Sequence, residues 1–210
     1  MLVASARPLR FQKTHYLVLG SGVALALGRA FEWELVDRLT IFLWMPVLAL
    51  VWLLWAATTV WSLIYAFLNR KNGLAALVPV VMAALFVGLA TTVPFTDLWL
   101  DWNFETKRQA REAVVARVVA GDLVPNVPNN NKLIALIGSP GLSKGGDEII
   151  VQGAGGSSYI FFYTFRGILD NYSGFLWVPS EGTPRAYMDA DEPDTQIEKL
   201  SDNWYFIGHR

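Results

Sequence analysis

Residues 39–68 read LTIFLWMPVLALVWLLWAATTVWSLIYAFL, a run of thirty residues without a charged side chain. As a helix this run is about 45 Å long at about 1.5 Å per residue, which exceeds the roughly 30 Å hydrocarbon core of a bilayer. A second uncharged run starts at Gly73, and only the four polar residues 69–72 separate the two runs. The pattern predicts two membrane-spanning helices, over about 39–68 and 73–95, with a tight connection between them.

The stretch before this pair allows two interpretations. Thirteen uncharged residues lie between His15 and Arg29, and they extend to a third span over about 15–31 if the Arg29 side chain reaches the membrane interface. The alternative is a cleaved signal peptide with Ala24-Leu25-Ala26 as its cleavage site. We favour a retained helix, because small residues recur here every four positions, as on packed membrane helices. The predicted helix-packing residues are Gly20, Ala24 and Gly28 in this segment and Ala84 and Gly88 in the last span.

Basic residues are concentrated at one predicted side of the membrane. Three of them precede the first segment and two, Arg70 and Lys71, join the last two spans, whereas the connection Glu32–Arg38 holds one arginine and three acids. Because loops rich in Lys and Arg remain cytoplasmic, residues 97–210 are expected on the opposite side. The sequence predicts an integral protein of the cytoplasmic (inner) membrane with an extracytoplasmic C-terminal domain.

The two halves of the chain differ in charge. The chain is 53% hydrophobic and 17% charged, whereas a soluble domain has about 25% charged residues. Residues 1–96 hold seven Lys/Arg and three Asp/Glu, and residues 97–210 hold ten and fifteen. The first half is expected to contact the lipid bilayer, and the acidic second half disfavours nucleic acid as a partner. The lack of cysteine excludes disulfides, thiolate metal sites and cysteine nucleophiles.

A helix is predicted at the start of the polar half, over about 103–120. Its apolar residues recur at helical spacing, which is typical of an amphipathic helix with one face packed on a core. Trp99 and Trp102, just before it, are expected at the membrane interface. The side expected to face water or headgroups carries Lys107, Arg108, Arg111 and Glu112.

From about residue 132 the pattern changes to short strands. Segments rich in Ile, Val, Phe, Tyr and Trp alternate with turn residues, and they lie at 132–137, 148–152, 158–166, 174–178 and 204–207. One helix followed by consecutive antiparallel strands is an α+β domain. The predicted fold class is therefore a membrane-anchored α+β protein: two to three transmembrane helices in residues 1–96, then an amphipathic helix and an antiparallel β-meander in residues 97–210.

Three segments could supply a binding or catalytic motif, but none contains all the residues that its motif requires at the required positions. Residues 133–144, LIALIGSPGLSK, resemble a phosphate-binding loop, but Ser143 and Gly145 replace its required glycine and Ser/Thr, so a hairpin loop is expected. The acidic cluster from Asp189 to Glu198 lacks the glycine and the final acid of an EF-hand. A Ser-His-Asp relay would depend on the penultimate residue, His209. We expect no catalytic residue, metal site or cofactor.

The strongest candidates for partner binding surround the end of the most aromatic strand. Arginine, tyrosine and tryptophan are enriched at interaction hot spots, and the predicted set is Arg166, Asp170, Asn171, Tyr172 and Trp177. The competing interpretation is structural, with an Arg166–Asp170 ion pair and turn chemistry from Asp170-Asn171. A single helix is also expected to leave part of the sheet uncovered for a partner.

These patterns lead to one functional hypothesis and one alternative. The spans carry no acidic residue, which argues against a transporter acting alone. We expect a non-enzymatic membrane protein whose outer domain binds a protein partner or a second copy, as an accessory subunit or a membrane-held immunity or inhibitor protein. The alternative is an envelope hydrolase that uses carboxylates such as Asp170 and Asp202, which requires two of them about 5–10 Å apart in a cleft.

Overall fold

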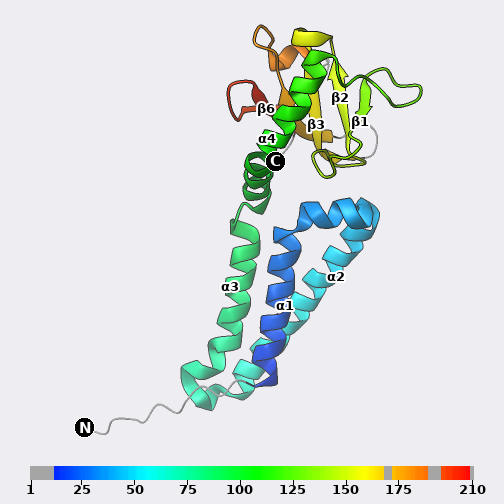
Figure 1. Cartoon of the computed structure of the whole chain (residues 1–210). Helices are drawn as coiled ribbons and strands as arrows, with labels where there is room; N and C mark the ends of the chain where they lie inside the picture. Colours follow the sequence, from blue (N-terminus) through cyan, green and yellow to red (C-terminus); the bar gives the residue numbers. More distant parts are fainter. Residues whose placement is uncertain (1–11, 168–171, 189–194, 209–210) are drawn as a thin grey trace. The chain divides into compact units, whose positions relative to one another are not determined.

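The computed structural model describes residues 12–167, 172–188 and 195–208. The chain forms two compact units, unit 1 over Met1–Phe95 and unit 2 over Thr96–Arg210. Unit 1 is helical and unit 2 contains an antiparallel sheet, as Figure 1 shows. The predicted α+β class is therefore confirmed.

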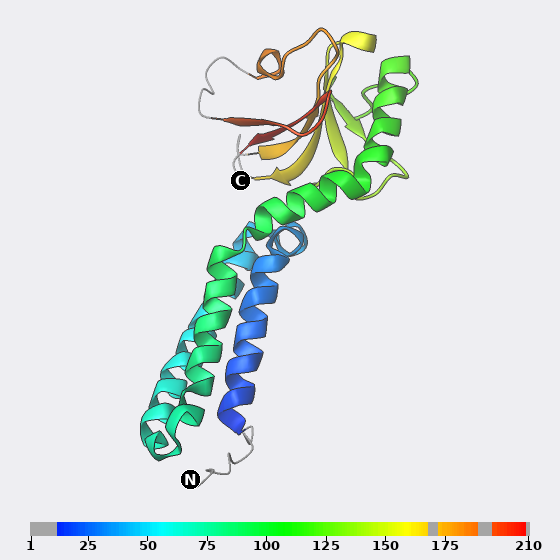
Figure 2. The ribbon, with the colours of Figure 1, turned by 90° about the vertical axis from the view of Figure 1, so that its left-hand side faces the viewer.

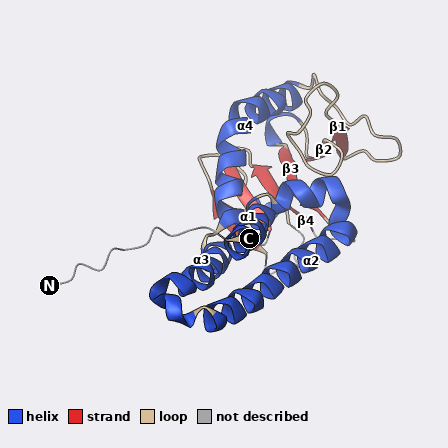
Figure 3. Ribbon diagram, turned by 90° about the horizontal axis from the view of Figure 1, so that it is seen from below, coloured by secondary structure: helices blue, strands red, loops and turns tan. Residues whose placement is uncertain are grey.

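The described residues of unit 1 form three long helices and a short 3-10 segment. They are α1 (Lys13–Ala30), α2 (Glu32–Leu68), η1 (Arg70–Leu77) and α3 (Val78–Thr92). Helix α1 lies between α2 and α3 and packs against both, as Figures 1 and 3 show. The connection expected at 32–38 is itself helical, and α2 bends at Thr40, whose φ of 61° is rare for a β-branched residue.

Ser21 and Gly22 lie on the face of α1 that contacts the other two helices, and both are buried. Ser21 Oγ lies 2.7 Å from Thr58 Oγ1 of α2. A Cβ atom on Gly22 would overlap the Phe86 side chain of α3, 2.2 Å from its nearest atom. Glycine at position 22 therefore lets the two helices approach closely, which is the role that small residues play between packed membrane helices.

The predicted helix-packing residues only partly share this face. Gly28 is buried, and a Cβ atom on it would lie 3.5 Å from the Trp44 ring. Ala24 is half-buried, whereas Gly20 and Ala84 are exposed. The predicted set also includes Gly88, which has open space above its Cα. Residues at four-residue spacing rotate by about 40° around the helix at each step. A series with this strict spacing therefore moves away from the face of α1 that contacts the other two helices.

The described residues of unit 2 form one long helix and a six-stranded sheet. Helix α4 spans Phe95–Ala120, eight residues earlier at its start than expected. All strand pairs are antiparallel, in the order β1-β2-β3-β4-β6-β5. The strands are β1 (Leu133–Ala135), β2 (Glu148–Gln152), β3 (Tyr159–Arg166), β4 (Tyr172–Trp177), β5 (Gln196–Lys199) and β6 (Trp204–Gly208), with 3-10 turns η2 (Gly155–Ser157) and η3 (Pro184–Ala186).

The five predicted strands form the predicted antiparallel meander, in the order β1-β2-β3-β4-β6. Strand β5 was not expected, and it occupies the sheet edge while β6 pairs with β4. Its sequence, Gln-Ile-Glu-Lys, contains a single apolar residue, and glutamate and lysine are depleted in strands. An edge strand exposed to water does not need the apolar pattern by which the other strands were recognised.

Both faces of the sheet are covered. On one face Phe104 of α4 packs against Phe175 and Trp204, with ring centroids 5.2 and 5.7 Å apart. On the other face Tyr187, which follows η3, stacks on Phe161 at 5.7 Å and 14°. Figure 2 shows α4 and the η3 segment on opposite sides of the sheet. Helix α4 is therefore not the only segment that covers the sheet, because Tyr187 packs on the face that α4 leaves uncovered.

Candidate functional site

One end of the sheet brings together four side chains from three adjacent strands. Arg166 is the last residue of β3, Glu148 is the first residue of β2, and Tyr172 is the first residue of β4. Antiparallel pairing places these positions at the same end, with Arg166 opposite Tyr172. Together with Tyr163 of β3 they form what we call the Arg166 surface.

Three contacts with described residues hold Arg166 in place. Its Nη1 donates to Glu148 Oε2 at 2.6 Å and to the carbonyl of Gly145 at 3.3 Å. Its guanidinium carbon lies 5.1 Å from the centroid of the Tyr163 ring. The arginine side chain is 39% exposed, and such exposed pairs contribute only about 0–1 kcal/mol to stability. The contacts therefore orient the guanidinium more than they stabilise the fold.

Arg166 has an acidic partner that the turn sequence does not indicate. The structure pairs it with Glu148, eighteen residues away in sequence. Asp170 and Asn171 lie outside the described residues. A pairing across two strands depends on sheet register, which a local pattern in the sequence does not contain.

Two tyrosines, Tyr163 and Tyr172, form the aromatic part of the Arg166 surface. Tyr172 is half-buried, and its ring lies 5.3 Å from that of Phe161 and 6.1 Å from that of Tyr163, both edge to face. Burial raises the pKa of Tyr163, while Arg166 acts to lower it and Glu148 to raise it. The Tyr163 hydroxyl is therefore neutral at physiological pH.

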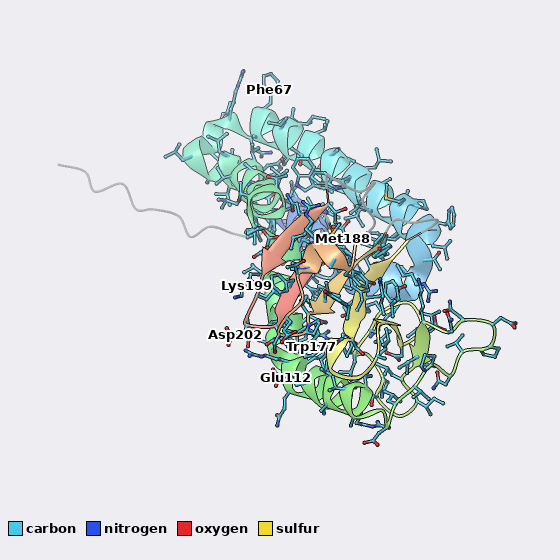
Figure 4. The ribbon with its side chains drawn as sticks, turned by 90° about the horizontal axis from the view of Figure 1, so that it is seen from above. Phe67, Glu112, Trp177, Met188, Lys199 and Asp202 are labelled. Atoms are coloured by element: carbon cyan, nitrogen blue, oxygen red, sulfur yellow. The ribbon has the colours of Figure 1, made fainter. Side chains whose placement is uncertain are left out.

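Trp177 does not belong to the Arg166 surface. It is the last residue of β4, five residues after Tyr172, which corresponds to about 17 Å along a strand. Because side chains alternate along a strand, an odd number of residues also places Trp177 and Tyr172 on opposite faces of the sheet. Figure 4 labels Trp177, which is half-buried.

The most elaborate polar site of unit 2 surrounds Arg111, a residue that the helix pattern placed on the polar side. Its side chain is 1% exposed. It donates to the Leu142 carbonyl at 3.1 Å and to the main-chain and side-chain oxygens of Asn103 at 3.1 and 2.6 Å. The guanidinium also lies 4.6 Å from the Phe175 ring centroid. The expectation of an exposed Arg111 was therefore wrong.

The spacing of the buried apolar residues of α4 indicates that Arg111 is buried. Arg111 stands seven residues after Phe104 and seven before Val118, both buried, so it occupies a core position of the helix. Burial lowers the pKa of Arg111 to about 9, and the side chain remains charged at neutral pH. Among the described residues no acidic side chain pairs with it. We interpret the site as structural, because carbonyl oxygens of the protein accept the hydrogen bonds of the guanidinium.

The glycine-rich loop between β1 and β2 is a hairpin loop, as expected. Ser143 Oγ donates to the Glu148 carbonyl at 2.5 Å and accepts from the Tyr163 amide at 2.9 Å. Lys107 Nζ of α4 donates to the Gly141 carbonyl at 2.6 Å. Strand β2, not a helix, follows the loop, so the N-terminal dipole of a phosphate-binding helix is missing. The loop instead ties α4 to the sheet.

Other residues singled out by the sequence give no cluster in the described part of the chain. There, no three His, Asp or Glu side chains are grouped as metal ligands. Asp202 is exposed in the turn between β5 and β6, where Figure 4 labels it with Lys199. His209 and the acids at 189–194 lie outside the described residues. Trp99, which was expected at the membrane interface, is buried within the protein: it is 7% exposed, and Lys144 Nζ lies 5.9 Å from its ring.

Comparisons add no relative from which function can be transferred. No protein-family model, no curated protein and no solved structure matches the chain. The function has to be argued from the residues themselves.

Proposed function

We propose that the chain is an integral membrane protein in which unit 1 is the anchor and unit 2 binds a protein partner outside the cytoplasm. The observation that carries the anchor is the apolar outer surface of α2 and α3. Phe42–Leu68 and Arg70–Thr92 are long and apolar enough to cross a membrane, and 11% and 22% of their most apolar windows are buried. Leu53 and Phe67 are 65% and 67% exposed, and Figure 4 shows Phe67 pointing away from its helix. Water solvates such a surface poorly, whereas lipid tails match it.

Helix α1 is retained in this proposal and completes the anchor. It packs against both of the other helices, and its Ser21–Thr58 hydrogen bond links it to α2. Hydroxyl pairs of this kind stabilise helix contacts inside membranes by about 0.6–2 kcal/mol. Cleavage after Ala26 would remove this contact and leave Thr58 without its partner from α1.

The charge distribution at the two ends of unit 1 supports an extracytoplasmic unit 2. The ring of His15 lies 5.9 Å from that of Tyr65, so the start of α1 lies beside the end of α2. Lys13, Arg70 and Lys71 therefore share one end of the unit. By the positive-inside rule this end is cytoplasmic, and α3, which starts at this end, then leads the chain to the opposite side.

The Arg166 surface is the proposed contact for the partner protein. It combines an arginine whose orientation is fixed with a tyrosine supported by other rings, and such anchors lose little conformational entropy when a partner binds. Glu148 neutralises the guanidinium while no partner is present. The partner expected for this chemistry is a protein that offers a carboxylate to Arg166 and an apolar or planar group to Tyr172.

The orientation is tested by cysteine labelling, since the chain has no natural cysteine. Lys199→Cys reports on β5 of unit 2 and Lys71→Cys reports on the connection between α2 and α3. In intact cells a membrane-impermeant maleimide is expected to label position 199 and to leave position 71 unlabelled until the cells are opened. Labelling of position 71 alone would contradict the proposed orientation.

Partner binding is tested by mild-detergent purification of the full chain from its native host, with mass spectrometry of co-purifying proteins. A stoichiometric companion is expected, and it should be lost in the double variant Arg166→Ala/Tyr172→Ala. Arg108→Ala is the matched control, because Arg108 is also an exposed arginine that pairs with a glutamate, Glu112. A companion that survives the double variant would refute the assignment of the Arg166 surface.

A further inference from the structure

The exposed face of α4 changes character along its length. Leu98 and Trp102, one turn apart, are 55% and 58% exposed. Asp101, which lies next to this pair, is exposed and acidic, and the exposed positions after the pair include Glu105 and Gln109. An apolar pair of this size is costly to leave in water, and it is confined to the first two turns of the helix.

Covalent continuity limits where these two turns are located. Helix α3 ends at Thr92 and α4 begins at Phe95, so three peptide units, at most about 11 Å of chain, separate the two helices. If α3 crosses the membrane, α4 starts within or next to the headgroup region, which is about 5–8 Å thick on each side. Leu98 and Trp102 differ by about 6 Å along the helix axis, a distance comparable to that thickness.

We propose that Leu98 and Trp102 insert into the outer headgroup region of the bilayer and anchor the first two turns of α4 there. This inference rests on the proposed membrane location of unit 1. Tryptophan prefers this region because its ring is apolar and its N–H is polar. Leucine supplies apolar area beside it, and the polar positions from Glu105 onward lie in water.

The exposure of the two side chains favours lipid as the occupant. Trp99, also in the first two turns, is buried within the protein, so the two tryptophans are separated into one that packs and one that points outward. The exposed tryptophan, Trp102, follows the proposed membrane-spanning helix α3 closely in sequence, so lipid is the nearest surface available to its side chain.

The test uses single cysteines carrying a nitroxide label in the full chain, reconstituted in vesicles of phosphatidylethanolamine and phosphatidylglycerol. Leu98→Cys and Trp102→Cys are the test positions, and Glu105→Cys is the matched control on the same face. Leu54→Cys, in the middle of α2, serves as the lipid reference, and exposed Asp122→Cys serves as the water reference. Each label is probed by collision with oxygen, which concentrates in lipid, and with a water-soluble nickel complex.

We expect the oxygen-to-nickel accessibility ratio at positions 98 and 102 to exceed that at position 105 by several-fold and to approach the lipid reference. If position 54 reports lipid but 98 and 102 match the water reference, the inference is overturned and the proposed anchor stands. If labels at 98 and 102 are inaccessible to both reagents, protein covers them and the inference is also overturned. If position 54 itself reports water, the proposed function fails as well.

Discussion

Replacing Arg111 by alanine tests whether the buried guanidinium holds α4 on the sheet. The substitution leaves three acceptor oxygens, two on Asn103 and one on Leu142, without their donor. Each buried acceptor without a partner costs about 1–3 kcal/mol of folding free energy. A buried charge that has no carboxylate partner is itself unfavourable, so its removal offsets several kcal/mol of that cost. We expect a net loss of about 3 kcal/mol in the free energy of unfolding of unit 2.

The assay is hydrogen exchange of the full chain in detergent, followed by mass spectrometry of peptides from α4 and β3. A loss of about 3 kcal/mol corresponds to exchange about 150-fold faster in the most protected amides. Arg108→Ala, one turn earlier on the exposed side, is expected to change the free energy by less than about 0.5 kcal/mol. Exchange in Arg111→Ala that remains within about threefold of the unmodified chain would show that the hydrogen-bond argument is wrong.

Three further predictions concern packing and pH. Gly22→Ile should separate α1 from α3 and lower the melting temperature in detergent, because its side chain meets a phenylalanine at 2.2 Å, whereas Gly20→Ile meets open space and should not. Gly174→Ala would bring a Cβ atom within 2.1 Å of a backbone oxygen of β3 and should cost more than about 3 kcal/mol. Gly156→Ala, with nothing within 4 Å, is its control in the same hydrogen-exchange assay. The raised pKa of Tyr163 means that the folded state binds more protons above about pH 10. Stability should therefore fall as pH rises through that range, and alkaline denaturation of Tyr163→Phe should lack this part of the loss.

The sheet is largely predictable from local patterns, and its edge is not. Strand β2 matches its predicted range residue for residue, because a short β-branched segment lies between a glycine-rich loop and Gly153. Strand β5 escapes prediction because its residues face water on an edge and carry no apolar alternation. Its position beyond β6 follows from pairing between distant segments, which local periodicity does not report.

The candidate site was predictable in composition but not in its contacts. Arg166 and Tyr172 are recognisable from their residue types at a strand end. Glu148 joins them only through the register of β2 against β3, and Trp177 is excluded only by the alternation of side chains along β4. For Arg111, residue type was misleading and position was informative. Its charge suggested exposure, but its place among the buried apolar residues of α4 indicated burial, and the side chain is buried.

The two partners of Arg111 become available at different moments of synthesis. Asn103 precedes it by eight residues on the same helix, so two of its three hydrogen bonds can form as soon as the end of α4 has been made. Leu142 follows thirty-one residues later, after the connector and β1. A nascent α4 can therefore satisfy most of the hydrogen bonds of its arginine internally, and the Leu142 carbonyl, with that of Gly141, joins the helix to the loop once the loop has been made.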